Sequence, residues 1–422
     1  MVADELMKKQ LFFIMMSAVM CGSVGQAFGA DVVLDNTSSP TTVSENDNVT
    51  VPDHAGADGN SQSNWILVND DNVTISITGT LQGASDLIDV NRNLSDLSIS
   101  VGSDGEIIAS GDRALDIDGS NRIVDNLTIE NDGTIYGGSA FIVSTQNVTN
   151  SSITNSATGH ISGARLAIML NGSSDTTLTN AGTISVDDNS TTYRDNLTAT
   201  RNTHADGRTI YADGADNLSI TNTGTIFSKT KETLYLMNVD NSSLNNTGTV
   251  TATTEQALKI ERADNFTLSN SGTITADTNT IYGDELENSV LTNNDNGTIS
   301  ADDDFVVYLQ YADNASIVNN GTIQSDNGSV FDTNNAVTAT ITNTGTIKTT
   351  SATTDYILSG DNTAFTNAAD GTITSTTDGL LLDSGNLFAN YGNFTIADNK
   401  TCLLYTSPSP RDLSTSRMPS SA

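Results

Sequence analysis

The chain has 422 residues, 51 of them acidic and 17 basic, and a formal net charge of −34. Nucleic-acid binding needs clustered Lys and Arg to neutralise phosphates, so this balance argues against a nucleic-acid partner. Aromatic residues make up only 5% of the chain, too few to fill several compact cores. A stack of thin repeats needs fewer large side chains, because each repeat buries only a few aliphatic residues.

The N-terminal segment has the pattern of a secretory signal peptide. Two lysines precede a ten-residue apolar run, LFFIMMSAVM, which is too short to span a bilayer as a stable helix. A small-x-small pattern ends at Ala27, so we expect residues 1–27 to be removed. The mature chain would begin at residue 28, or at residue 31 if cleavage follows Ala30.

Cys21 and Cys402 are the only cysteines, so the region between them contains none. Although we expect an oxidising destination, the stability of this region cannot rest on disulfides. A chain without cross-links also suits export across a second membrane in an unfolded state.

Residues 65–400 repeat a unit marked by Gly-Thr-Ile. Between Gly224 and Gly345 the glycines are 24, 24, 25, 24 and 24 residues apart, and such a period indicates a repeat architecture. An interval of 42 residues before Gly224 marks an insertion at about residues 188–208. Residues 28–64 are expected to form a lead-in or cap. The marking glycines are Gly79, Gly105, Gly133, Gly159, Gly182, Gly224, Gly248, Gly272, Gly297, Gly321, Gly345 and Gly371, with a degenerate thirteenth at Gly392.

Apolar residues alternate with polar residues inside each unit. Around Gly224, for example, Ile220 and Ile226 share one parity, and Leu234 and Leu236 repeat the alternation further on. A period of two is typical of β-strands and not of a helical stripe. Each unit therefore predicts three short strands, which pair in parallel with the next unit at about 4.8 Å.

In eleven units, asparagine lies two residues after the first aliphatic position of the unit, as Asn222 does after Ile220. This position has the parity of the inward-facing residues, so the stacked amides can hydrogen-bond along the molecule. Asparagine also tolerates left-handed backbone, and we expect it to form a corner together with the nearby glycine. The column predicts a structural ladder rather than a ligand site. It consists of Asn131, Asn155, Asn180, Asn222, Asn246, Asn270, Asn293, Asn319, Asn343, Asn367 and Asn390.

The Asn-x-Gly-Thr-Ile rung, the export signal and the cysteine-free interior together resemble the passenger of a type V autotransporter. The resemblance covers residues 65–400 and implies an all-β, pectin-lyase-like, right-handed parallel β-helix of about 13 rungs with three short strands each. It also implies a location at the cell surface, on the outer membrane or outside a Gram-negative bacterium. A leucine-rich repeat has a similar period, but its asparagine spacing differs and no helical half-repeat is present.

Members of this family carry a C-terminal β-barrel that exports and anchors the passenger. The sequence contains no such strands, so we expect it to be truncated before the barrel. Residues 401–422 hold three of the five prolines and lack Asn and Gly. They resemble a translated sequencing adaptor or cloning junction, and a disordered natural tail is the alternative.

Catalytic motifs are missing from the sequence. It has no nucleophile elbow, P-loop or H-E-x-x-H motif, and its three histidines, at positions 54, 160 and 204, are scattered. We therefore expect no catalytic residue, no cofactor and no enzymatic activity.

Two sets of residues are candidates for binding. Asp277, Asp302 and Asp326 each follow a marker glycine by five residues on consecutive units, which predicts a possible Ca²⁺ site of stacked oxygen ligands. A solvated loop edge is the alternative. Loops that protrude from rigid scaffolds often carry recognition, so the insertion is a candidate for ligand binding, or else a passive loop. Its candidate residues are Tyr193, Arg194, Arg201, His204 and Arg208.

The sequence thus predicts a monomeric, non-catalytic, adhesin-like rod that contacts a host, a cell or a polysaccharide. The alternative is a carbohydrate-active enzyme, either a lyase or a hydrolase, on the same scaffold. Paired Thr-x-Thr positions also resemble ice-binding arrays, but ordinary β-propensity explains threonine on an exposed strand better.

Overall fold

The computed structural model describes twelve ranges of the chain. Three predicted segments lie outside them: the signal peptide, most of the insertion, including residues 187–206, and the tail at 401–422. The described ranges are 31–33, 41–52, 66–83, 86–90, 92–109, 113–118, 123–137, 141–186, 207–350, 356–376, 379–380 and 385–397.

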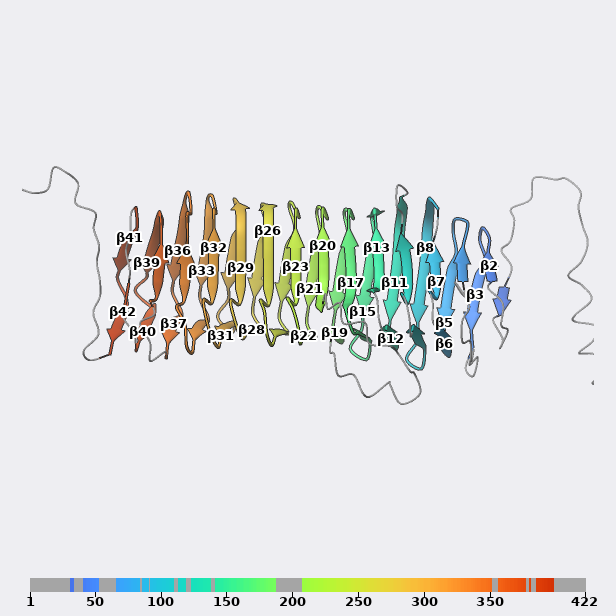
Figure 1. Cartoon of the computed structure of the whole chain (residues 1–422), viewed down its shortest axis with the longest axis horizontal. Helices are drawn as coiled ribbons and strands as arrows, with labels where there is room; N and C mark the ends of the chain where they lie inside the picture. The colour runs from blue at the N-terminus through green and yellow to red at the C-terminus, as the bar shows by residue number, and fades with distance from the viewer. Residues whose placement is uncertain are drawn as a thin grey trace, which may run out of the picture.

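Within these ranges the chain forms an all-β parallel solenoid of about 12 turns, close to the 13 rungs predicted. Each full turn contributes one strand to each of three parallel sheets, and successive turns stack along the long axis (Figure 1).

Sheet 1 comprises β1 (Asp31–Val33), β3 (Asn48–Val51), β5 (Thr74–Ile77), β8 (Leu94–Val101), β11 (Val124–Asn131), β14 (Val148–Thr149), β15 (Ser152–Asn155), β18 (Thr177–Asn180), β21 (Ser219–Asn222), β24 (Ser243–Asn246), β27 (Thr267–Asn270), β30 (Val290–Asn293), β33 (Ala315–Asn319), β36 (Ala339–Asn343), β39 (Thr363–Asn367) and β41 (Leu387–Asn390).

Sheet 2 comprises β2 (Thr41–Val43), β4 (Ile66–Val68), β7 (Ile88–Val90), β10 (Leu115–Asp118), β13 (Phe141–Gln146), β17 (Leu166–Asn171), β20 (Arg208–Asp213), β23 (Leu234–Met237), β26 (Leu258–Asp264), β29 (Ile281–Glu287), β32 (Val307–Gln310), β35 (Phe331–Thr333) and β38 (Leu358–Gly360).

Sheet 3 comprises β6 (Thr80–Gly83), β9 (Glu106–Ala109), β12 (Thr134–Gly137), β16 (His160–Gly163), β19 (Thr183–Val186), β22 (Thr225–Ser228), β25 (Thr249–Ala252), β28 (Thr273–Ala276), β31 (Thr298–Ala301), β34 (Thr322–Ser325), β37 (Thr346–Thr349), β40 (Thr372–Ser375) and β42 (Asn393–Ile396).

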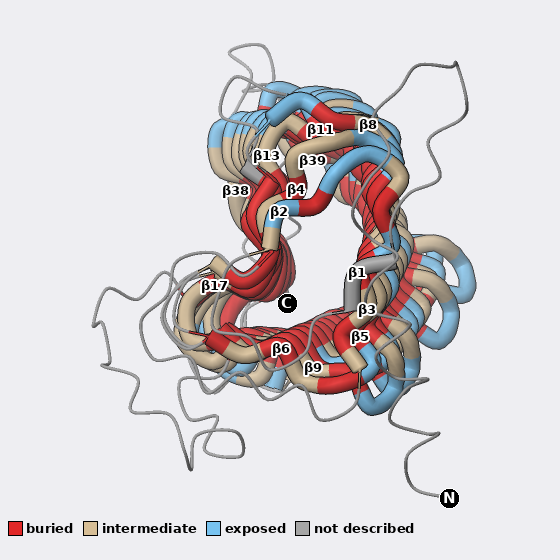
Figure 2. Tube along the Cα trace, turned by 90° about the vertical axis from the view of Figure 1, so that its right-hand side faces the viewer, coloured by how far each residue is buried: buried red, intermediate tan, exposed pale blue. Residues whose placement is uncertain are grey.

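The strand register confirms the predicted inward columns. Ile220 pairs with Leu244 in sheet 1, and Ile226 pairs with Val250 in sheet 3. These side chains are buried, and along most strands they alternate with more exposed neighbours. One continuous hydrophobic cluster results, and its buried residues line the inside of the coil (Figure 2). The solenoid begins within the predicted lead-in, because β1 and β3 extend sheet 1 and β2 extends sheet 2.

The asparagine ladder is also confirmed. From Asn131 to Asn390, each side-chain Nδ2 donates to the Oδ1 of the asparagine on the next turn, at 2.7–2.8 Å, in ten consecutive hydrogen bonds. The same nitrogen also donates to backbone carbonyls, for example from Asn222 to Thr249 at 3.1 Å. Because the described side chains of this column are buried from Asn131 to Asn367, the ladder satisfies polar groups that would otherwise be costly.

The explanation of the corner by left-handed backbone at the ladder is wrong. No member of the ladder has positive φ, whereas asparagines elsewhere, such as Asn238 and Asn241, do. The marker glycines are required by close approach instead. A Cβ at Gly248 would lie 2.1 Å from the carbonyl oxygen of Gly224 on the preceding turn, so no side chain fits there.

Candidate functional site

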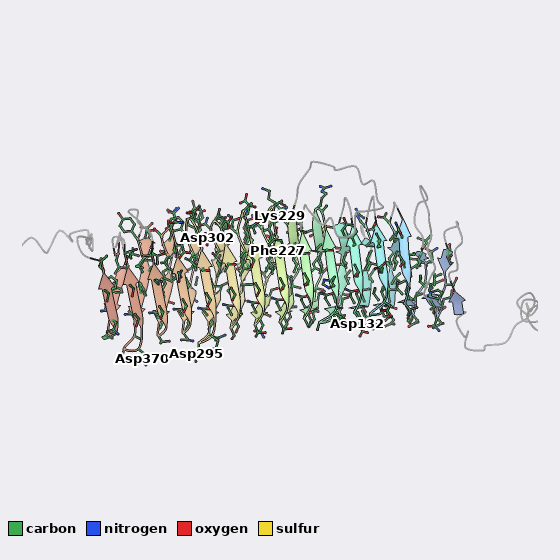
Figure 3. The ribbon with its side chains drawn as sticks, turned by 90° about the horizontal axis from the view of Figure 1, so that it is seen from below. Asp132, Phe227, Lys229, Asp295, Asp302 and Asp370 are labelled. Atoms are coloured by element: carbon green, nitrogen blue, oxygen red, sulfur yellow. The ribbon has the colours of Figure 1, made fainter. Side chains whose placement is uncertain are left out.

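The three aspartates predicted to bind Ca²⁺ do stack. Each directly follows a strand of sheet 3, and Asp302 and Asp326 donate their backbone N–H groups to Ala276 and Ala301, both at 3.0 Å. Burial and then the charges of Asp277 and Asp326 raise the pKa of the Asp302 carboxyl. Asp302 lies at the surface (Figure 3).

Among the described residues, however, no group of three or more His, Cys, Asp or Glu side chains is arranged to hold a metal ion. Asp326 is engaged by protein donors, because Gln324 donates to its Oδ1 at 2.6 Å and Thr350 at 3.1 Å. Ca²⁺ binding by the stack therefore remains a prediction.

Four of the five candidate residues of the insertion, Tyr193, Arg194, Arg201 and His204, lie outside the described part of the chain. The fifth, Arg208, begins strand β20 and is thus part of sheet 2. Its Nε lies 3.2 Å from Oε2 of Glu232, and its guanidinium carbon lies 4.7 Å from the ring centroid of Tyr235.

Arg208 thereby joins a file of side chains on the outer face of sheet 2, here called the tyrosine–lysine strip. Tyr211, Tyr235, Lys259, Tyr282 and Tyr308 occupy the same register position on β20, β23, β26, β29 and β32. The ring centroids of Tyr211 and Tyr235 are 5.4 Å apart, and those of Tyr282 and Tyr308 are 5.3 Å apart. Lys259 Nζ lies between the two pairs, 4.6 Å from the Tyr235 centroid and 5.6 Å from that of Tyr282. These ring–ring contacts, tilted in the first pair and stacked in the second, and the cation–π contacts favour a fixed arrangement of the strip.

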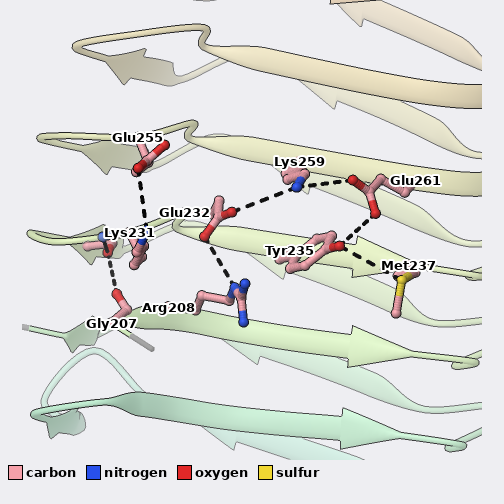
Figure 4. Close-up of polar contacts among 10 residues, drawn as sticks. Gly207, Arg208, Lys231, Glu232, Tyr235, Met237, Glu255, Lys259 and Glu261 are labelled. Atoms are coloured by element: carbon pink, nitrogen blue, oxygen red, sulfur yellow. Dashed lines mark hydrogen bonds and ion pairs between the residues drawn. The ribbon is translucent and has the colours of Figure 1, made fainter. Parts of the chain in front are cut away.

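Carboxylates fix the polar ends of the strip (Figure 4). Tyr235 donates its hydroxyl to Glu261 at 2.6 Å, and Lys259 lies 3.0 Å from Glu261 and 4.0 Å from Glu232. Burial and the Glu261 hydrogen bond raise the pKa of Tyr235. Burial opposes ionisation of Glu261, but the hydrogen bonds from Tyr235 and Lys259 prevail and lower its pKa.

The carboxylate next to Glu261 behaves in the opposite way. Asp284 pairs with Glu261 in the register of β26 and β29. Burial, together with the charges of Glu285 and Glu261, raises the pKa of Asp284. Its Oδ1 is buried and has no hydrogen-bond partner among the described residues.

A shallow hollow of about 410 Å³ lies where these strands leave sheet 2. Five carboxylates surround one guanidinium and one tyrosine there, so the hollow is acidic. Its lining residues are Asp240, Arg262, Asp264, Glu285, Leu286, Glu287, Tyr311 and Asp313.

The outward threonines of sheet 3 form an unbroken file from Thr183 to Thr372 across eight adjacent strands. A second file beside it is interrupted by larger side chains such as Phe227, which pairs with Thr251 (Figure 3). A flat two-file Thr-x-Thr array is therefore limited to a few turns.

Sequence reasoning missed both the strip and the hollow. The strip does leave a signal, because Tyr235, Lys259 and Tyr308 each lie between two buried aliphatic residues of their strand, as Tyr235 does between Leu234 and Leu236. Aligning that outward position would have revealed a column of tyrosine and lysine. The hollow leaves no such signal, since its walls combine the ends of β26 and β29 with corner residues of the neighbouring turns.

The fold and the site define the chain as a parallel β-solenoid with an internal asparagine ladder and an aromatic outer strip. No family model, curated protein or solved structure matches it. No helix in the described ranges is long and apolar enough to cross a membrane.

Proposed function

We propose that this protein is a non-catalytic, adhesive rod of a Gram-negative cell surface, carried as the right-handed β-helical passenger of an autotransporter. The observation that supports this best is the filled interior. One aliphatic cluster and one asparagine ladder occupy the inside of the coil, so binding has to use the outer faces. The tyrosine–lysine strip supplies such a face, because half-exposed tyrosines are enriched in contact surfaces.

Export and adhesion are tested separately. The full chain, expressed in a Gram-negative host, should lose its signal peptide, which N-terminal sequencing of the exported protein would detect. Beads coated with the exported chain should be retained on bacterial cells, epithelial cells or immobilised polysaccharide, relative to beads coated with heat-unfolded chain. Equal retention of both kinds of bead on every surface would contradict the adhesive function.

A polysaccharide-cleaving enzyme is a second candidate, favoured by the neighbouring carboxylates Glu261 and Asp284. Their pKa values move in opposite directions, as an acid and a base that share a site require. Incubation with neutral and acidic polysaccharides would reveal new reducing ends or unsaturated products. Activity that is abolished by Glu261→Gln or Asp284→Asn alone would replace the adhesive proposal.

A further inference from the structure

Three consecutive turns have unusual residues at one corner of the solenoid. On eight successive turns, one equivalent position has positive φ. It directly follows the stretch of sheet 2 in which all these turns pair with one another. Five of these residues are Asn or Gly, the types that tolerate this conformation. The other three, on β26, β29 and just after β32, are large. The eight are Asn147, Gly172, Gly214, Asn238, Arg262, Glu285, Tyr311 and Asn335.

Side chains with a Cβ are disfavoured in left-handed backbone, so Arg262, Glu285 and Tyr311 each cost folding free energy relative to Asn or Gly. All three are exposed, and Tyr311 retains 50% of its accessible surface. They therefore gain little from burial in return. Unfavourable conformations that persist without a packing benefit point to a use for the side chain.

The same three side chains line the shallow hollow, and the same three turns carry one end of the tyrosine–lysine strip. Tyr282 donates its hydroxyl to Gln310 at 3.2 Å, directly beside Tyr311. The strip and the hollow thus form one continuous surface that runs over the outer face of sheet 2 and around its corner. A ligand lying on it would contact aromatic edges, hydroxyl groups and carboxylates, together with the Lys259 ammonium and the guanidinium groups of Arg208 and Arg262.

The charges of this surface select the chemistry of the ligand. Lys259 is already paired with Glu261 and Glu232, and Arg262 donates to Asn238 at 2.9 Å, so little positive charge is left for an anionic polymer. The five carboxylates of the hollow and the net charge of −34 would repel such a polymer. Carboxylates and tyrosines instead accept hydrogen bonds from hydroxyl groups, and aromatic rings contact apolar C–H groups.

We infer that this surface binds a neutral, hydroxyl-rich glycan along the turns of β26, β29 and β32. The inference rests on the proposed adhesive function and names the class of its ligand. The corner side chains Arg262, Glu285 and Tyr311 make the contacts that select the glycan, and the sugar rings lie on the tyrosine–lysine strip.

The test uses the full chain and a panel of dextran, laminarin and galactomannan as neutral probes, with polygalacturonate and chitosan oligosaccharides as charged probes. The combined variant Arg262→Asn, Glu285→Asn and Tyr311→Asn should weaken binding of the neutral probe roughly tenfold or more in affinity electrophoresis. The same variant should melt at a higher temperature than the unmodified chain, because asparagine suits the left-handed corner. Weaker binding together with a higher melting temperature would indicate that these side chains serve binding and lower the stability of the fold.

A matched control replaces the same kinds of side chain elsewhere: Lys231→Asn, Glu255→Asn and Tyr391→Asn, all outside the strip and hollow. It should bind as the unmodified chain does. Binding to none of the neutral probes, binding only to chitosan, or a lower melting temperature of the corner variant would each overturn the inference. If beads adhere but no soluble neutral probe binds, glycan binding is contradicted and the adhesive function stands. If neutral probes bind but beads do not adhere, the adhesive function is contradicted and glycan binding stands.

Discussion

At the scale of single residues, the asparagine ladder makes the sharpest prediction. Asn246 donates to Asn270, Gly248 and Thr273 and accepts from Asn222, all inside the coil. Asn246→Ala should lower the free energy of unfolding by about 2–4 kcal/mol, because buried partners are left without hydrogen bonds. Urea denaturation measures this loss.

The control is the neighbouring Asn245→Ala, whose side chain is exposed. It should change the free energy of unfolding by less than about 0.5 kcal/mol. Equal effects of the two substitutions would show that the ladder contributes nothing beyond ordinary surface contacts.

Tyr282 predicts how stability depends on alkaline pH. Burial and the nearby Asp284 carboxylate raise its pKa to about 12. The unfolded chain releases this proton near pH 10, whereas the folded chain holds it until about pH 12. The free energy of unfolding should therefore fall as pH rises through this interval, and Tyr282→Phe should flatten the fall. Tyrosinate absorbance of both proteins, followed with urea denaturation, provides the measurement.

The aspartate stack gives a prediction for cation binding. Because Asp277 and Asp326 repel the Asp302 carboxylate, Asp302→Asn should raise the melting temperature in the absence of divalent ions. Millimolar Ca²⁺ should raise the melting temperature of the unmodified chain and leave that of Asp302→Asn unchanged. Asp132→Asn, another exposed aspartate, serves as the control. If the melting temperature of Asp302→Asn still rises with Ca²⁺, the three aspartates do not form the Ca²⁺ site and are a solvated loop edge.

At the scale of the strand and its turn, the marker glycines are set by the distance between turns. Gly248→Ala would place a methyl group 2.1 Å from the Gly224 oxygen and 2.7 Å from the Thr223 carbonyl carbon. Because backbone atoms cannot yield as a flexible side chain can, β22 and β25 should separate locally, at a cost of about 1–3 kcal/mol. Hydrogen exchange of the β25 amides would report the opening.

Gly102→Ala is the matched control, because its Cβ would lie 3.6 Å from the nearest atom, the Ile77 oxygen. This is an ordinary contact, so exchange at β5 and β8 should stay unchanged. Faster exchange in both variants would mean that chain flexibility, and not contact between turns, explains the glycines.

Much of each turn could be predicted from sequence, because aliphatic burial with a period of two is visible in any single unit. Ile220 and Ile226 show it without knowledge of their partners. The strip required the register between turns, which the insertion hides before Tyr211. The hollow could not be predicted, since Arg262, Glu285 and Tyr311 are not residue types that indicate positive φ. Only the Asn and Gly residues at equivalent corners indicate it.

At the scale of the whole molecule, every turn contacts only its neighbours, so stability is close to a sum over turns and interfaces. The predicted outcomes above should accordingly be local, with changes confined to the altered turn and those beside it. The strip and the hollow extend over several turns, however, and a ligand that spans them would couple turns that are otherwise nearly independent.

The ladder also gives the rod a direction. All ten side-chain amide bonds run the same way, so the small dipoles of the column add up. Asn131 leaves an oxygen without a partner at one end, where the preceding turn has Val101. Turning a single amide inside the column would bring oxygen against oxygen on one side and nitrogen against nitrogen on the other. The orientation of these side chains is therefore a collective property, which the whole column keeps or reverses together.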